Sequence, residues 1–147
     1  MARKHAVLSA SSAARWLTCP PSARLNAEKS DAPSEYAAQG TDAHTLCEYK
    51  LRKALGERVR DPTKNLASYD TEMEECAEAY CQFVMELVGQ FRAESKDTMV
   101  SVEQRVDFSS FVPDGFGTAD TLIISGKIVC IVDYKHGKGI EVSADHT

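Results

Sequence analysis

The sequence predicts an α/β protein, with a small mixed β-sheet built on an antiparallel hairpin and flanked by helices that precede it in the chain. Two observations predict this class. Apolar residues recur with a helical period of 3.6 through residues 70–94. After Ser95 the period shortens to two, and turn residues separate the apolar runs. The length of 147 residues suits one domain, so we expect a single domain over residues 1–147.

The helical segments come first. The serines at 9–12 offer N-caps for a short helix at 13–17, which the prolines at 20 and 21 would end. Residues 35–55 also have helical spacing, and we expect a break at Gly40, with Thr41 as the cap of a new start.

The clearest helix is expected over residues 70–94. Thr71 and Glu74 have the spacing of a capping box at its start. The apolar stripe that follows is expected to be core, and it consists of Met73, Cys76, Ala77, Tyr80, Val84, Leu87, Val88 and Phe91.

Three strands are expected over residues 100–109, 117–125 and 127–135. A two-residue turn would join the last two. A turn at Ser125-Gly126 would pair Asp120 with Ile131, on the same face as Asp133. A turn at Gly126-Lys127 places glycine at the first turn position, which suits it. Ser125 then pairs with Ile128.

In this register Asp120 lies directly opposite Asp133, and Lys135 points to the same face. Two opposed carboxylates repel each other, whereas a divalent cation between them would reverse the sign of the interaction. A simple Asp133–Lys135 ion pair at a strand end is the structural alternative.

The order of these motifs resembles the PD-(D/E)xK nuclease core. Gly117-Thr118-Ala119-Asp120, a hairpin and then Asp133-Tyr134-Lys135 match its central pattern. Upstream, "GTDAH" from Gly40 to His44 resembles the helix that supplies a histidine ligand in RecB-like members. "SASSAARWLTCP" near the N-terminus resembles the opening motif of the same branch, and the chain looks most like a phage-encoded RecB-like family of unknown function.

The resemblance implies a restriction-endonuclease-like fold and roles for the matching residues. Asp120 and Asp133 would be metal ligands, Lys135 the catalytic lysine, and His44 and the backbone carbonyl of Tyr134 further ligands. Glu103, on the first strand, is a weaker candidate near the site.

The basic stretch that follows the last strand, from Lys135 to Gly139, suggests a DNA contact apart from the resemblance. Lys138 would lie near the phosphate backbone, and a solvated loop is the structural alternative.

The function that follows is a divalent-metal-dependent DNA nuclease of phage recombination or DNA processing, in the cytoplasm of a bacterial host. Mg²⁺ or Mn²⁺ would be the cofactor, and the attacking group a metal-bound water. DNA is the expected partner. A second copy of the chain, or a recombination protein of the phage or host, is a further possible partner. A noncatalytic DNA-binding or interaction module with the nuclease fold is the alternative function. A zinc site of His44 with Cys47 is a third.

Composition narrows the classes further. The net charge of -5 argues against broad, nonspecific attraction to nucleic acid. Apolar runs are too short for a membrane helix, so no membrane partner is expected. The five scattered cysteines include no CxxC pair, so we expect reduced thiols.

The chain departs from the RecB-like pattern in two respects. Some RecB-like relatives hold an iron–sulfur cluster with an N-terminal Cys-Pro cysteine and a C-terminal cysteine trio. This chain has Cys19-Pro20 but no such trio, so we expect no cluster. RecB-like members carry a Q-x-x-x-Y helix after the D-x-K strand. This chain stops at "EVSADHT", which suggests a C-terminally truncated domain.

Overall fold

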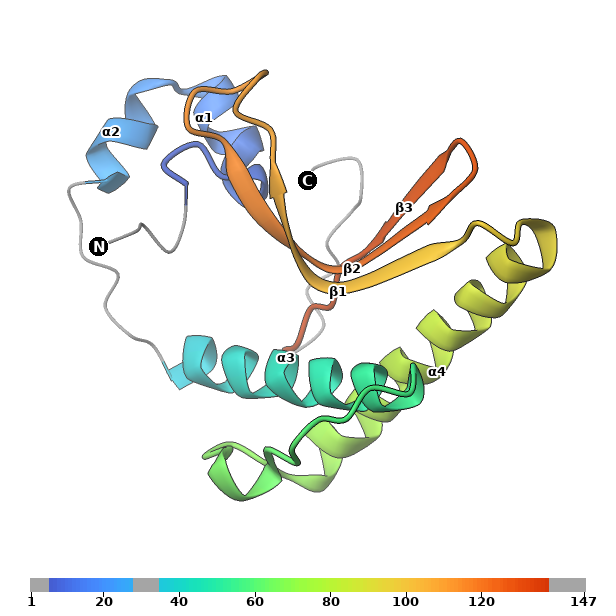
Figure 1. Ribbon diagram of the computed structural model, residues 1–147. Coiled ribbons are helices and arrows are strands. Elements are labelled where there is room, and N and C mark those ends of the chain that lie inside the picture. The colour runs from blue at the N-terminus through green and yellow to red at the C-terminus, as the bar shows by residue number, and fades with distance from the viewer. Residues whose placement is uncertain (1–5, 28–34, 138–147) are drawn as a thin grey trace. The chain divides into compact units, whose positions relative to one another are not determined.

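The structure is a computed structural model that describes residues 6–27 and 35–137 (Figure 1). The described residues divide into two compact units. One contains residues 6–27 and 105–118, and the other contains residues 35–104 and 119–137. The α/β class is confirmed, whereas the single domain over residues 1–147 stays a prediction.

The first unit begins with short helices. A 3-10 turn, η1 (Ala10–Ser12), leads into α1 (Ala13–Thr18), close to the predicted 13–17. A second helix, α2 (Pro21–Ala27), was not predicted. Its first residue is proline, which suits a helix start because the missing N–H would be unpaired there in any case.

Two long helices dominate the second unit. The first, α3 (Glu35–Ala54), is continuous, so the predicted break at Gly40 is wrong. Thr41 caps no new helix, because its hydroxyl donates back to the Ala37 carbonyl one turn earlier. A short 3-10 turn, η2 (Thr63–Asn65), lies in the following loop.

The second long helix, α4 (Thr71–Glu94), matches the prediction closely, but its cap does not. Asp70 is the N-cap, and its carboxylate accepts from the Met73 N–H at 2.7 Å. The predicted Thr71–Glu74 capping box is therefore wrong by one residue. Cys76, expected in the apolar stripe, is exposed, and Cys81 is buried instead.

The sheet has the order β1 (Met99–Asp107), β2 (Phe116–Ser125), β3 (Ile128–Val132). The hairpin register is confirmed, since Ser125 pairs with Ile128 and Thr121 with Val132. Gly126 has the positive φ of +57° that the first turn position requires. The third strand is shorter than predicted and ends at Val132, so residues 133–135 lie outside it.

The core of the second unit lies between the sheet and the two long helices, which cross below the strands in Figure 1. Ile123 on β2 is fully buried, and so are Leu46 and Leu51 on α3 and Val84 on α4. Tyr134, just beyond β3, also belongs to this core. Leu46 on α3 packs in this core with Val102 on β1 and Ile123 on β2. Across the described residues, none of the helices combines the length and apolar character needed to cross a membrane.

Candidate metal centre

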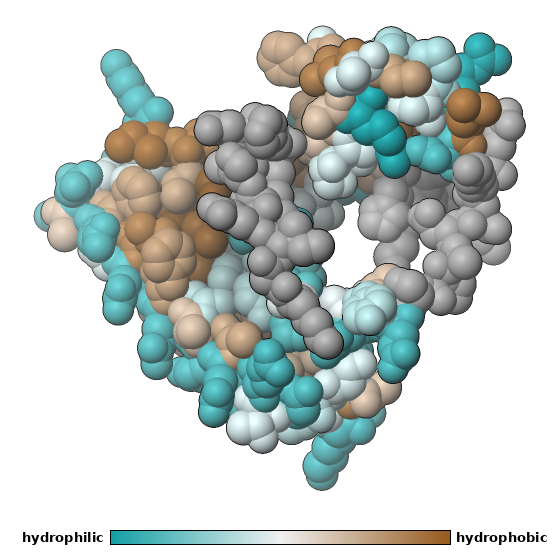
Figure 2. Space-filling view, turned by 180° about the vertical axis from the view of Figure 1, so that it is seen from behind, coloured by the Kyte–Doolittle hydropathy of each residue, from teal (hydrophilic) through white to brown (hydrophobic). Residues whose placement is uncertain are grey.

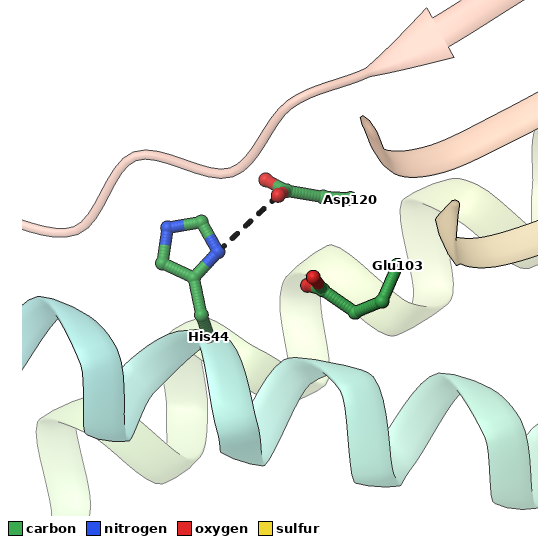
Figure 3. Close-up of side chains that lie close together, drawn as sticks. All are labelled: His44, Glu103 and Asp120. Atoms are coloured by element: carbon green, nitrogen blue, oxygen red, sulfur yellow. Dashed lines mark ion pairs between the residues drawn. The ribbon is translucent and has the colours of Figure 1, made fainter. Parts of the chain in front are cut away.

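Three side chains from three elements converge in the second unit (Figure 3). His44 comes from α3, Glu103 from β1 and Asp120 from β2. One ligand atom of each lies within 4.8 Å of the others, and all three residues are partly buried. In the described part of the chain this is the one such cluster of histidine, cysteine or acidic residues.

Asp120 has both carboxylate oxygens engaged. Oδ2 accepts from the Tyr134 N–H at 2.6 Å, and Oδ1 lies 3.4 Å from His44 Nδ1. Burial works to raise the pKa of Asp120, but the bond to His44 and the Tyr134 N–H outweigh it and hold that pKa below 3.8. Asp120 is therefore a fixed, ionised acceptor.

His44 faces this carboxylate with about a third of its side chain exposed. The hydrogen bond to Asp120 raises the pKa of His44, although burial opposes it. The ring also meets the Tyr134 ring edge-on, with centroids 5.6 Å apart. Tyr134 thus contacts both site residues, the histidine through its ring and the aspartate through its backbone.

Glu103 reaches the cluster through an unusual backbone. Its φ is +50°, a conformation that costs a non-glycine residue roughly 1–3 kcal/mol. Side chains in a regular strand alternate between faces, and Val102 is already buried against the helices. The positive φ turns the next side chain toward α3 as well, as Figure 3 shows.

The charge balance of the cluster favours a cation. Burial raises the pKa of Glu103, and the nearby carboxylates of Asp120 and Glu48 raise it further. The carboxylate of Asp120 is ionised and that of Glu103 lies beside it, so the two offer hard oxygen ligands for a divalent ion, and His44 adds a nitrogen ligand. The residues present therefore fit Mg²⁺ or Mn²⁺.

Asp133 and Lys135 are placed differently from the expected pair. Asp133 lies one residue beyond the last ladder pair and forms an ion pair with Lys135 at 2.6 Å. Both side chains are about half exposed, and Asp133 does not belong to the cluster. The Lys135 ammonium is nonetheless near enough to add to the lowering of the Asp120 pKa, and it opposes in part the rise in the His44 pKa that Asp120 causes.

The remaining predicted residues have three different outcomes. The Tyr134 carbonyl as a ligand, like Asp133 as a ligand, stays a prediction. Lys138 lies outside the described residues. Cys47, the partner in the zinc alternative, does not belong to the cluster, and burial raises the pKa of its thiol to about 12. That shift disfavours the thiolate that zinc binding needs.

Glu103, which the sequence indicates only as a weaker candidate, belongs to the cluster in the structure. Strand alternation places it on the face of Ser101 rather than that of Val102, and the sequence gives no signal for the positive φ that reverses this. Arg52 contacts β1 beside Glu103, and its sequence context does not predict this contact. A single arginine near a helix end is too common a pattern to indicate such a contact.

The chain belongs to the DUF2800 family, described as a protein of unknown function, whose family model matches residues 5–147. A comparison with solved structures gave no significant match.

Proposed function

We propose that this member of the DUF2800 family is a divalent-metal-dependent DNA nuclease that acts in phage recombination or DNA processing. The observation that carries the proposal is the convergence of His44, Glu103 and Asp120 within 4.8 Å. The sequence resemblance to PD-(D/E)xK nucleases supports the reaction class, since it includes two of these three residues.

Residues of this chain would bind the metal ion and stabilise the phosphate during cleavage. His44, Glu103 and Asp120 would hold the ion. When bound, Mg²⁺ or Mn²⁺ would polarise a phosphate oxygen and lower the pKa of a coordinated water. Lys135, on the segment that follows β3, would offset negative charge that develops on the phosphate. Asp133 would orient that lysine through the 2.6 Å ion pair.

A cleavage assay tests this proposal. End-labelled single- and double-stranded DNA would be incubated with the protein and Mg²⁺ or Mn²⁺. We expect cleavage that EDTA abolishes, and that falls at least ~100-fold in Glu103→Gln and in Lys135→Met. Lys127→Met, an exposed lysine in the hairpin turn, is the matched control and should cleave normally. Equal cleavage by Glu103→Gln and the wild type would contradict the proposal.

The alternative, a noncatalytic module with the same fold, is favoured by one observation. Lys135 binds Asp133 rather than a member of the cluster, and both side chains are half exposed. This function predicts DNA binding without cleavage in the presence of bound metal. The same assay, combined with a gel-shift measurement, separates the two functions.

Whether Asp133 is a ligand is decided by comparing two variants. If Asp133 joins His44 and Asp120 around the ion, Asp133→Asn should weaken Mn²⁺ binding as strongly as Glu103→Gln does. If Asp133 only orients Lys135, cleavage should fall in Asp133→Asn while Mn²⁺ affinity stays close to that of the wild type.

A further inference from the structure

Arg52, near the end of α3, has all its polar groups directed at neighbours. Its Nε donates to Glu48 at 2.8 Å, and its Nη1 donates to Glu57 at 3.0 Å. Its Nη2 donates across to the backbone carbonyl of Val102 on β1 at 3.0 Å. The two glutamates hold the guanidinium plane in place, and the third bond joins the helix to the strand.

The carbonyl that Arg52 binds belongs to the peptide that joins Val102 to Glu103. This is the point where β1 leaves the regular strand conformation, because Glu103 follows with φ +50°. A backbone carbonyl that is removed from water needs a hydrogen-bond partner, and Arg52 Nη2 donates to this one. The guanidinium supplies this partner and offsets part of the backbone strain.

We propose that Arg52 is a positioning residue for the metal centre, since it holds the Val102 carbonyl and thereby directs the Glu103 carboxylate toward His44 and Asp120. The proposal rests on the proposed function, because that function supplies the metal. The conformation of Glu103 can be measured in the metal-free protein. Arg52 itself touches neither the ion nor the DNA in this account.

The chemistry of the side chain explains why an arginine stands here. Its planar fork donates in several fixed directions, so one residue can bind two carboxylates and a carbonyl at once. A lysine offers a point charge on a flexible stem and cannot hold the same three acceptors in one plane. The positive charge also acts on Glu103 directly, because it opposes the rise that burial causes in the pKa of that carboxyl.

The test begins with the metal-free protein. A residue with positive φ gives a strong NMR cross-peak between its own amide and α protons, because the two protons lie closer together than in a strand. We expect this cross-peak at Glu103 in the wild type and its loss or marked weakening in Arg52→Met. Arg52→Lys, which keeps the charge and less of the geometry, should retain part of it.

Metal binding supplies the second readout. Calorimetric titration with Mn²⁺, well below the unfolding temperature of each variant, should show an affinity about 10–100-fold weaker in Arg52→Met. Arg92→Met on α4, an exposed arginine, is the matched control and should leave both the cross-peak and the affinity unchanged. If Arg52→Met does not fold, the double variant Glu48→Gln with Glu57→Gln releases the guanidinium by a milder route and should show the same effects.

The outcomes separate this proposal from the proposed function. An unchanged Glu103 cross-peak together with unchanged Mn²⁺ affinity in a folded Arg52→Met would overturn the positioning role. A lower melting temperature with unchanged affinity would do the same, since it would show that Arg52 merely joins α3 to β1. No Mn²⁺ binding by the folded wild type would overturn the proposed function, and the metal-free cross-peak would still decide whether Arg52 sets the Glu103 backbone.

Discussion

Asp120 and His44 form a charged pair whose contribution to stability should fall at both low and high pH. Asp120 sits at 13% exposure with both oxygens engaged, and His44 lies 3.4 Å from it. The pKa of the aspartate is depressed from 3.8 and that of the histidine is raised from 6.5. Each shift means that folding favours the charged form of the group.

The pair should stabilise the metal-free protein most between pH 3.8 and 6.5. The contribution of Asp120 is present above its unfolded pKa and is lost as the pH falls through its lower folded value. The contribution of His44 is present below its unfolded pKa and is lost as the pH rises through its higher folded value.

Thermal unfolding of the wild type and His44→Asn checks this expectation. The wild type should be more stable by about 1 kcal/mol in that window, since the pair is partly exposed, and the two curves should converge at higher pH. Making both measurements in a Glu103→Gln background removes the separate titration of Glu103. A difference that grows as the pH rises above 7 would contradict the assignment.

At this scale the sequence predicts His44 and Asp120 as site residues, but it gives only weak support for Glu103. Motif spacing identifies residues whose side chains follow regular strand or helix geometry. The direction of Glu103 depends on a single dihedral angle and on Arg52, whose partner Val102 is fifty positions away in the chain. Local patterns carry no information about either.

At the scale of the element, Gly40 lies inside α3 although glycine disfavours a helix. The helix continues through this residue, and a Cβ added at this position would meet nothing within 4 Å. Glycine in the interior of a helix is entropically costly, so the helix forms despite this residue.

Gly40→Ala should therefore raise the stability by about 0.5–1 kcal/mol, because alanine lowers the entropy of the unfolded chain. Chemical denaturation of the two proteins measures the difference. Gly56→Ala is the opposing control, since its φ of +90° makes any side chain unfavourable and the substitution should destabilise. A loss of stability in Gly40→Ala would instead favour the predicted break at this position.

The start of α4 gives a second prediction for an element. Asp70→Ala removes the side-chain acceptor of the Met73 N–H and should cost about 1 kcal/mol. Thr71→Ala, which would have destroyed the predicted capping box, should change the stability by less than about 0.5 kcal/mol. The reverse order in denaturant titrations would show that Thr71 is the cap.

The long elements were predictable because their apolar periods are long and unbroken, as in residues 70–94. The end of β3 was not, since Asp133 and Lys135 continue the alternation of the strand while the ladder stops at Val132. The Tyr134 N–H donates to the Asp120 side chain instead of to a strand partner. This bond to a residue of the metal centre replaces the next pair of the ladder, and the strand ends before it.

At the scale of the whole molecule, the two faces of the hairpin differ sharply. Ile123 on β2 is fully buried against the helices, while Ile131 on β3 is 59% exposed and Val129 is 63% exposed. Figure 2 shows hydrophobic surface gathered on the side of the molecule that carries this hairpin. The helices therefore cover one face of this hairpin, while Val129 and Ile131 on its other face stay exposed.

This asymmetry predicts unequal effects of the same substitution. Ile123→Ala should destabilise by about 2–5 kcal/mol, because it leaves a cavity in the core. Ile131→Ala should cost less than about 1 kcal/mol, since its side chain is largely in water already. Denaturant unfolding of both variants measures the pair, and similar losses would indicate that the outer face is covered in solution.

The central claim is that His44, Glu103 and Asp120 hold a divalent cation, and calorimetric titration of Mn²⁺ tests it most directly. The folded wild type should bind one ion per chain, and Asp120→Asn should bind it at least ~10-fold more weakly. Asp97→Asn, an exposed carboxylate ahead of β1, should bind like the wild type. Equal affinity in the wild type and Asp120→Asn, or no binding by the folded wild type, would contradict the account.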